Sequence, residues 1–213
     1  MASRIFPLVA GLLWCICSTA AAPVPVLLVL GDSLSAGYGL KQGEAWPDLL
    51  QHKLESLGHP YYVVNASISG ETTRGGLTRL PALLEEHRPA VVVIELGAND
   101  GLRGLPLDEF AGNMRALVAT VIAAGAAPVV VPMRVPPNYG RAYATGFADV
   151  YAGLPAQFPA VSLAPFFLED VVLDPALMQA DGLHPTAAAQ PEMLAKVWPS
   201  IESKLRAPGE SQQ

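Results

Sequence analysis

Cysteine and charged side chains are both scarce in this chain of 213 residues. Only two cysteines occur, Cys15 and Cys17, and charged residues make up 15% of the sequence against 51% hydrophobic ones. Lysine and arginine number 13 against 19 aspartates and glutamates, so the chain has too little basic charge to form the positive surface that nucleic acids require. With so few cysteines, a fold of this length must depend on its hydrophobic core rather than on disulfides.

The amino-terminal residues 1–21 have the pattern of a secretory signal. They contain one cation, Arg4, then an uncharged stretch over 5–16 and a cluster of small residues. The apolar run is shorter than the ~20 residues that cross a bilayer, so we expect cleavage rather than a membrane anchor. We therefore predict a signal peptide over 1–21, and a mature protein in the periplasm or outside the cell.

Removal of this segment changes the composition of the mature chain. Both cysteines lie within it, so the mature chain has none, and the loss of Arg4 alone leaves 12 basic and 19 acidic residues. We expect one domain over 22–207, followed by a polar tail over 208–213. The predicted protein is acidic, has no nucleic-acid partner and is a monomer.

Short β-rich runs alternate with longer amphipathic stretches along the rest of the chain. Strands are predicted at 24–30, 61–66, 91–96, 128–132 and 161–163. Helices are predicted near 45–57, 72–86, 107–124, 141–157 and 186–206. This alternation predicts an α/β three-layer sandwich with a central five-stranded parallel sheet and helices on both faces.

Two short motifs supply the residue types of a hydrolytic site. Ser33 follows the first predicted strand, and Asp181 lies three residues before His184 in a segment that ends at Pro185. A serine hydroxyl becomes a good nucleophile when an imidazole removes its proton, and the imidazole works best when a carboxylate holds its other nitrogen. The motifs therefore indicate a serine hydrolase.

Further polar or glycine positions follow the second and third predicted strands. Gly70 comes after the second, and Asn99 and Asp100 come after the third. Because the carboxyl ends of parallel strands lie at one edge of a sheet, we expect these positions to lie close to Ser33. Asp32 and Asp100 are interpreted as structural residues that cap turns or helix starts.

Each of these residues also has an ordinary structural interpretation. A lone serine after a strand is most often a turn residue, and it gains weight here only because the other motifs accompany it. Asp181 and His184 are also suitable metal ligands, but no third ligand stands at a fitting spacing. Trp46 and Trp198 are expected to be core or cleft-edge aromatics.

Four sequence blocks together resemble the SGNH (GDSL) hydrolase family. The blocks are Gly31-Asp32-Ser33-Leu34-Ser35, Gly70 after Ser69, Gly97-Ala98-Asn99-Asp100 and Asp181-Gly182-Leu183-His184. The sequence between these blocks is similar to the periplasmic acyl thioesterase, lysophospholipase and arylesterase subgroup. Examples are the segments Ala45-Trp46-Pro47 and Asn138-Tyr139-Gly140-Arg141. Ser35 occupies the last glycine position of a Gly-x-Ser-x-Gly elbow, which disfavours an ordinary α/β-hydrolase fold.

The resemblance implies roles for individual residues. Ser33 would be the nucleophile, His184 the general base and Asp181 the carboxylate that orients it. The backbone N–H groups of Ser33 and Gly70 and the side-chain amide of Asn99 would form the oxyanion hole. No metal or organic cofactor is called for.

Apolar residues near the predicted strand ends suggest an acyl pocket. The candidate substrate-binding residues are Leu34, Leu77, Leu80, Leu102 and Tyr139, and the stretch 73–80 is a candidate mobile wall. The resemblance implies a secreted esterase acting on acyl esters and lysophospholipids, with thioesterase capability. Alternatives are a carbohydrate O-acetyl esterase, transfer of the acyl group to an alcohol, and a non-catalytic protein that binds acyl ligands.

Overall fold

The computed structural model describes residues 24–205 and shows a five-stranded sheet in which every strand pair is parallel. The strands are β1 (Val26–Gly31), β2 (Tyr62–Asn65), β3 (Val91–Glu95), β4 (Ala127–Val130) and β5 (Ser162–Leu163). Their order in the sheet is β2-β1-β3-β4-β5. The predicted fold class is confirmed.

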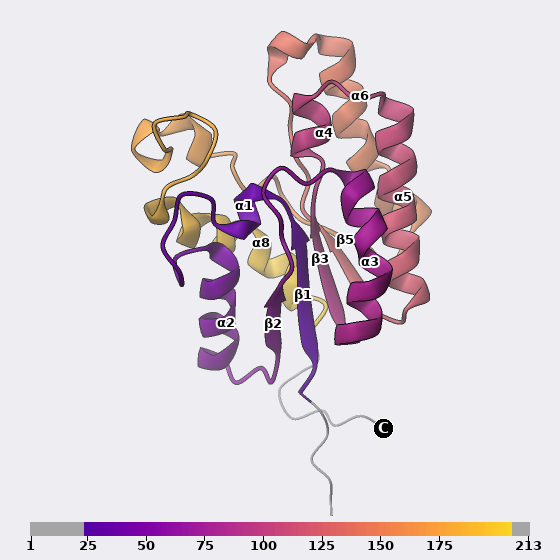
Figure 1. Ribbon diagram of the computed structural model, residues 1–213, viewed down its shortest axis with the longest axis vertical. Coiled ribbons are helices and arrows are strands. Elements are labelled where there is room, and N and C mark those ends of the chain that lie inside the picture. The colour runs from indigo at the N-terminus through magenta and orange to yellow at the C-terminus, as the bar shows by residue number, and fades with distance from the viewer. Residues whose placement is uncertain (1–23, 206–213) are drawn as a thin grey trace, which may run out of the picture.

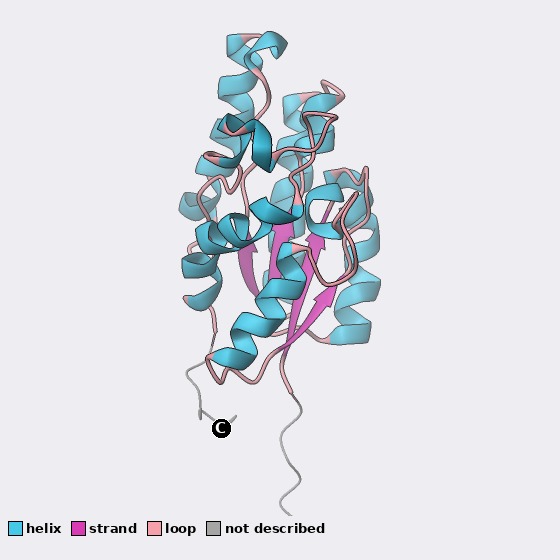
Figure 2. Ribbon diagram, turned by 90° about the vertical axis from the view of Figure 1, so that its left-hand side faces the viewer, coloured by secondary structure: helices cyan, strands magenta, loops and turns pink. Residues whose placement is uncertain are grey.

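Helices cover both faces of the sheet, as Figures 1 and 2 show. The longer helices are α2 (Trp46–Ser56), α3 (Thr73–His87), α5 (Leu107–Ala123), α6 (Arg141–Ala152) and α8 (Gln190–Glu202). Helices α3 and α5 pack against each other, and so do α2 and α8. The short helices are α1 (Ser33–Ala36), α4 (Ala98–Leu102) and α7 (Leu154–Gln157), with 3-10 turns η1 (Pro137–Tyr139), η2 (Val171–Leu173), η3 (Pro175–Leu177) and η4 (Ala187–Ala189).

The central strands are buried because helices cover them on both sides. Every residue of β3 is buried, and residue 29 of β1 pairs with Asn65 of β2 on one side and with Val93 of β3 on the other. Such strands are continuously apolar rather than alternating, since both faces need hydrophobic side chains. β3 ends with Glu95, a buried carboxyl in an otherwise apolar strand.

Two predicted helices differ from the structure. The stretch 141–157 contains two helices, α6 and α7, separated at Gly153. The last helix begins at Gln190 rather than at residue 186, because the chain first makes the 3-10 turn η4. Proline at 191 occupies one of the first positions of α8, where a missing N–H costs nothing.

The predicted signal peptide lies outside the described residues, as do the end of the predicted domain and the polar tail. Across residues 24–205, no helix has both the length and the apolar character needed to span a bilayer.

Candidate active site

The candidate site lies where the strand order reverses, at the carboxyl ends of β1 and β3. In open parallel sheets this switch point leaves a crevice, because the chain leaves neighbouring strands in opposite directions. Ser33 is the first residue of α1, directly after β1, and Asn99 lies in α4, directly after β3. Asp32 is the N-cap of α1 and accepts a hydrogen bond from the Leu34 N–H, which confirms its predicted capping role.

Ser33, His184 and Asp181 form a continuous hydrogen-bonded series. The Ser33 hydroxyl lies 2.9 Å from His184 Nε2, and His184 Nδ1 lies 2.7 Å from Asp181 Oδ2. The three side chains thus have the distances that a nucleophile, a base and an orienting carboxylate require. Within the described chain no group of three His, Cys, Asp or Glu side chains is placed to hold a metal ion.

The turn that carries His184 is organised by Asp181 itself. Its Oδ1 accepts the backbone N–H groups of Leu183 and His184, while its Oδ2 faces the imidazole. The His184 backbone N–H and the His184 ring are the leading causes that hold the pKa of Asp181 well below its usual value. Tyr38 packs its ring 4.3 Å from the imidazole, centroid to centroid, and restricts its orientation.

Gly70 lies beside the cavity in a conformation that side chains avoid. Its φ is +81°, and a Cβ built there would meet only the end of the Arg103 side chain, 4.0 Å away. The glycine is therefore required by backbone conformation more than by crowding. The Gly70 carbonyl accepts a hydrogen bond from Arg103 at 2.9 Å.

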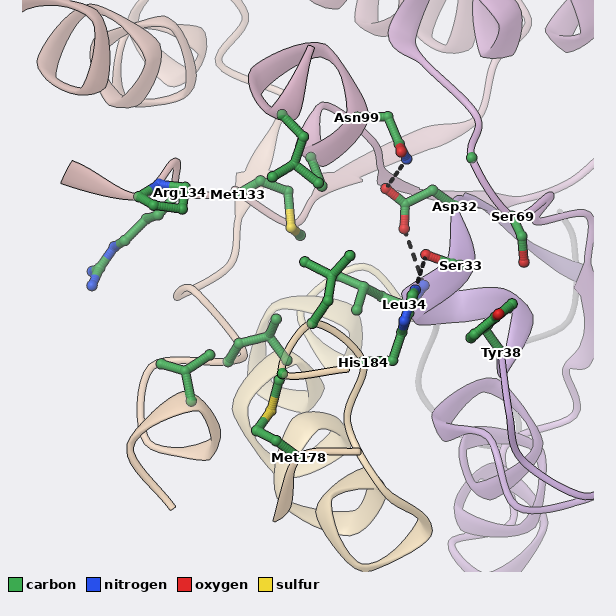
Figure 3. A pocket seen from close by; sticks show the side chains of 18 of the residues that line it. Asp32, Ser33, Leu34, Tyr38, Ser69, Asn99, Met133, Arg134, Met178 and His184 are labelled. Carbon is green, nitrogen blue, oxygen red and sulfur yellow. Dashed lines mark hydrogen bonds between the residues drawn. The ribbon is translucent and has the colours of Figure 1, made fainter. Parts of the chain in front are cut away.

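Asn99 is aimed into the site by the turn that precedes it. Gly97, the N-cap of α4, has a φ of +123°, and an added Cβ would collide with the hydroxyl of Tyr151. Asn99 Nδ2 donates to Asp32 Oδ2 and to the Glu71 carbonyl, both at 3.0 Å. The bond to Asp32 is visible in Figure 3.

A cavity of about 490 Å³ opens at this site. Figure 3 shows Ser33 and His184 at one side of it and Arg134 at the other. The lining includes the hydrophobic side chains of Leu34, Leu102, Met133, Phe166, Leu168, Val172, Met178 and Leu183. A cavity with apolar walls and a few convergent polar groups is typical of a site for a small organic substrate.

Two of the five predicted pocket residues line this cavity, namely Leu34 and Leu102. The prediction is wrong for Leu80, which is fully buried in the core, and for Leu77, which packs against that core. Both lie in α3, so the stretch 73–80 is part of a helix rather than a wall of the cavity. Tyr139 is not among the lining residues either; its hydroxyl donates to the Leu102 carbonyl at 2.7 Å.

Much of the cavity wall comes from segments after β4 and β5, whereas four of the five candidate pocket residues come from the segments after the first three predicted strands. Met133 and Pro136 follow β4, and Phe166, Leu168 and Val172 follow β5. The same edge rule, extended to all five strands, indicates these segments. Met178 lies further along, in a segment that pairs antiparallel with Pro185 beside the histidine turn.

Three buried carboxyls surround the site. Burial is the main cause that raises the pKa of Asp32 to about 6 and that of Glu95 well above its usual value. Burial also raises the pKa of Asp100, whose carboxylate binds the N–H and the hydroxyl of Thr73 at the start of α3. Asp100 thereby joins α4 to α3 and accepts the first N–H of α3, which agrees with its predicted structural role at a helix start.

Comparison with known proteins identifies close relatives. Residues 29–190 match the sequence model described as the GDSL-like Lipase/Acylhydrolase family. Esterase TesA of Pseudomonas aeruginosa is 47% identical over 198 residues, which cover 93% of this chain and 98% of that protein. The protein of Escherichia coli K12 named thioesterase 1/protease 1/lysophospholipase L1 is 49% identical over 171 residues, 80% of each chain.

Solved structures agree with the sequence comparison. A crystal structure of TesA superposes with a TM-score of 0.81 at 49% identity, covering 84% of this chain and 99% of that one. The psychrotrophic esterase EstA from Pseudoalteromonas sp., in a structure inhibited by monoethylphosphonate, gives 0.80 at 44% identity, covering 84% and 97%. The resemblance carried by the four motifs is confirmed. The chain belongs to the GDSL-like lipase/acylhydrolase family and is an ester hydrolase.

Proposed function

We propose that this ester hydrolase is a secreted serine esterase that cleaves acyl esters and lysophospholipids through Ser33, His184 and Asp181. The observation that supports this most directly is the unbroken series from the Ser33 hydroxyl to His184 at 2.9 Å and on to Asp181 at 2.7 Å. The series brings together residues 151 positions apart in the sequence, at the mouth of an apolar cavity.

In the proposed reaction, His184 Nε2 accepts the proton of Ser33 as its oxygen attacks the acyl carbonyl. Collapse of the tetrahedral intermediate breaks the ester bond, and His184 passes the proton to the leaving alcohol. Water then attacks the acyl-enzyme with the same imidazole as base, and the carboxylic acid leaves. Asp181 holds Nδ1–H of the imidazole and stabilises its protonated form.

The negative oxygen of the tetrahedral intermediate needs fixed donors. The Ser33 N–H, the Gly70 N–H and the Asn99 amide are the proposed set, since all three residues line the cavity. Asn99 already donates to Asp32 and Glu71, so its amide is held in place before substrate binds. Both of its hydrogens face these acceptors, so one of the two bonds is shared with the oxyanion or released to it during the reaction.

The cavity favours acyl chains longer than acetyl. Its walls beyond Ser33 are largely apolar, and its volume of about 490 Å³ is within the range of pockets that hold drug-sized ligands. The similar proteins are named esterase, arylesterase and thioesterase 1/protease 1/lysophospholipase L1. A carbohydrate O-acetyl esterase stays the alternative, and preference for p-nitrophenyl acetate over the octanoate would favour it.

Secretion is proposed from the sequence of residues 1–21. A cleaved signal predicts that protein recovered outside the cytoplasm begins near residue 22. Mass spectrometry of its amino terminus tests this, and an intact terminus carrying Met1 would contradict it.

Replacement of Ser33 by alanine tests the nucleophile. The variant S33A should lose detectable hydrolysis of p-nitrophenyl octanoate and should no longer react with a fluorophosphonate probe, because the Ser33 hydroxyl is the group hydrogen-bonded to His184 Nε2. The matched control is S56A, which removes an exposed serine at the end of α2 and should keep both properties. Undiminished turnover by S33A would reject the assignment.

A non-catalytic binding protein is the competing proposal from another class. It would bind acyl ligands without hydrolysing them, and the wild-type protein would not react with the fluorophosphonate. The relative EstA has been solved with a phosphonate inhibitor, which gives this measurement a direct precedent.

A further inference from the structure

The polar side chains buried within the described residues gather around the candidate site. They are Asp32, Ser35, Thr73, Glu95, Asp100 and Gln190. A buried polar group is costly unless it is hydrogen-bonded, so such groups are usually retained for a specific contact. None of the six is a reacting group of the proposed mechanism, and three of them, Ser35, Glu95 and Gln190, belong to one hydrogen-bonded series with Trp46.

Glu95 reaches from the end of β3 to the underside of the turn that carries the nucleophile. Its Oε2 lies 2.5 Å from the Ser35 hydroxyl and 3.3 Å from the Asp32 N–H. These two groups flank Ser33 in the sequence. Gly31 makes the approach possible, since a Cβ there would lie only 2.7 Å from the same carboxyl oxygen.

The direction of the hydrogen bonds follows from the donors available. The indole N–H of Trp46 can only donate, and it points to the Ser35 oxygen at 3.1 Å. Ser35 therefore gives its own hydrogen to Glu95, and Glu95 Oε2 acts as an acceptor for both Ser35 and Asp32. Glu95 thus serves this turn as an acceptor.

The same series of bonds continues to the turn that carries His184. The backbone N–H of Trp46 donates to Gln190 Oε1 at 3.0 Å, and Gln190 Nε2 donates to the Thr186 carbonyl at 3.2 Å. Thr186 is two residues beyond His184. This series therefore joins the two loops that carry the nucleophile and the base. We call its four side-chain members the buried chain: Glu95, Ser35, Trp46 and Gln190.

The two carboxyl oxygens of Glu95 have different surroundings, and only Oε2 serves as the acceptor for the turn that carries the nucleophile. Its other oxygen, Oε1, is buried without a hydrogen-bond partner, and burial raises the pKa of the carboxyl. Since Oε2 already accepts two hydrogen bonds, a proton taken up by this carboxyl would sit on Oε1. Glutamine has the same shape, with an oxygen to accept in place of Oε2 and an NH₂ group in place of Oε1.

We propose that Glu95 and Gln190 are positioning residues, which act through the buried chain to hold Ser33 within hydrogen-bonding distance of His184. The proposal rests on the proposed function, because it assigns these residues to the alignment of that nucleophile and base. A displacement of about 1 Å at reacting groups can cost about 10²-fold in rate. A second link joins the same two loops, because Gln179 Nε2 donates to the carbonyls of Tyr38 and Pro185. The buried chain holds the loops on the core side, where its side chains are buried.

A comparison of E95A with E95Q tests the proposal. E95A should lower kcat for p-nitrophenyl octanoate about 10²-fold with KM nearly unchanged, since the cavity wall stays intact. E95Q should keep kcat within about threefold of wild type, because the amide oxygen still accepts from Ser35 and Asp32. S35A breaks the same link with a smaller change in volume and decides the question if E95A does not fold; it too should lower kcat.

Q190M extends the test to the histidine loop. It should lower kcat by a factor similar to that of E95A. The double variant E95A/Q190M should be no slower than the slower single variant, because both substitutions interrupt the same series of hydrogen bonds. The control is V121A, which opens a cavity in the fully buried part of α5 away from the site and should reduce stability without changing kcat.

Several outcomes overturn the proposal. They are wild-type kcat in a folded E95A or S35A, an E95Q as slow as E95A, or losses that multiply in the double variant. A V121A control that loses kcat as the variants do would also reject positioning in favour of general destabilisation. Failure of the proposed function differs from failure of the positioning proposal in the behaviour of the wild-type protein. If the proposed function is wrong, wild-type protein neither hydrolyses the ester nor reacts with a fluorophosphonate.

Discussion

Asn99 shows how one side chain depends on partners that its sequence neighbourhood does not reveal. Its amide nitrogen is held by Asp32 from the end of β1 and by the Glu71 carbonyl from the loop before α3. Both hydrogens are therefore engaged before substrate arrives. An oxyanion at this site would have to share or replace one of these two acceptors, so the two bonds fix the place of the amide beside the cavity.

Removal of this donor gives a residue-level prediction. N99A should lower kcat about 10²- to 10³-fold, the usual loss for one oxyanion-hole donor. The measurement is steady-state hydrolysis of p-nitrophenyl octanoate. N138A, which changes an exposed asparagine in η1, is the control and should match wild type. An N99A enzyme as fast as wild type would remove Asn99 from the oxyanion hole.

At the scale of elements, the site depends on how each strand ends. β1 passes into a one-turn helix that begins with Ser33, and β3 passes through Gly97 into α4. Gly97 has both a positive φ and a crowded Cβ position, against Tyr151 and Phe110. The buried hydroxyl of Tyr151 also donates to the Leu96 carbonyl at 2.8 Å, which fixes the residue just before Gly97.

The turn at Gly97 gives a prediction at this scale. G97A should lower the free energy of unfolding by about 1–3 kcal/mol, the range for a strained backbone position, and should also lower kcat by displacing Asn99. Chemical denaturation and ester hydrolysis measure the two effects. G112A is the matched control, since Gly112 lies inside α5 with nothing near its added Cβ.

G112A should raise stability by about 0.5–1 kcal/mol, because alanine is the better helix former, and should leave kcat unchanged. If G97A were as harmless as G112A, the turn would not be the device that aims Asn99.

For the whole molecule, the buried carboxyls link stability to pH. The folded-state pKa of Asp32 is about 6, against an ordinary value of 3.8, so the unfolded chain releases this proton first as pH rises. The folded state then binds more protons than the unfolded state between these values. The contribution of Asp32 to stability is therefore lost as the pH rises from about 4 to about 6.

The corresponding prediction compares wild type with D32N. Between pH 4 and pH 6 the free energy of unfolding of wild type should fall relative to that of D32N by up to about 3 kcal/mol. Denaturation at a series of pH values measures the difference. V121A, which changes no titratable group, should run parallel to wild type, and a parallel course for D32N would mean that the pKa of Asp32 is not raised.

Local sequence determined the elements and the chemistry of this protein. Apolar runs and the turns after them indicated five parallel strands, and short motifs indicated Ser33, His184 and Asp181 as the residues to be brought together. These signals are readable because strand periodicity, caps and turn residues act over a few positions. The same signals failed for Leu77 and Leu80, since their place in α3 turns them to the core.

Only the tertiary structure decided which loops meet and what lies between them. The wall after β4 and β5, the two partners of Asn99 and the buried chain from Glu95 to Gln190 all join segments that are distant in sequence. Such contacts depend on the order of the strands in the sheet and on the packing of helices over them. No local sequence pattern specifies the order of the strands. Glu95, for example, has the same sequence neighbours at the end of β3 whichever side chain it contacts in the folded protein.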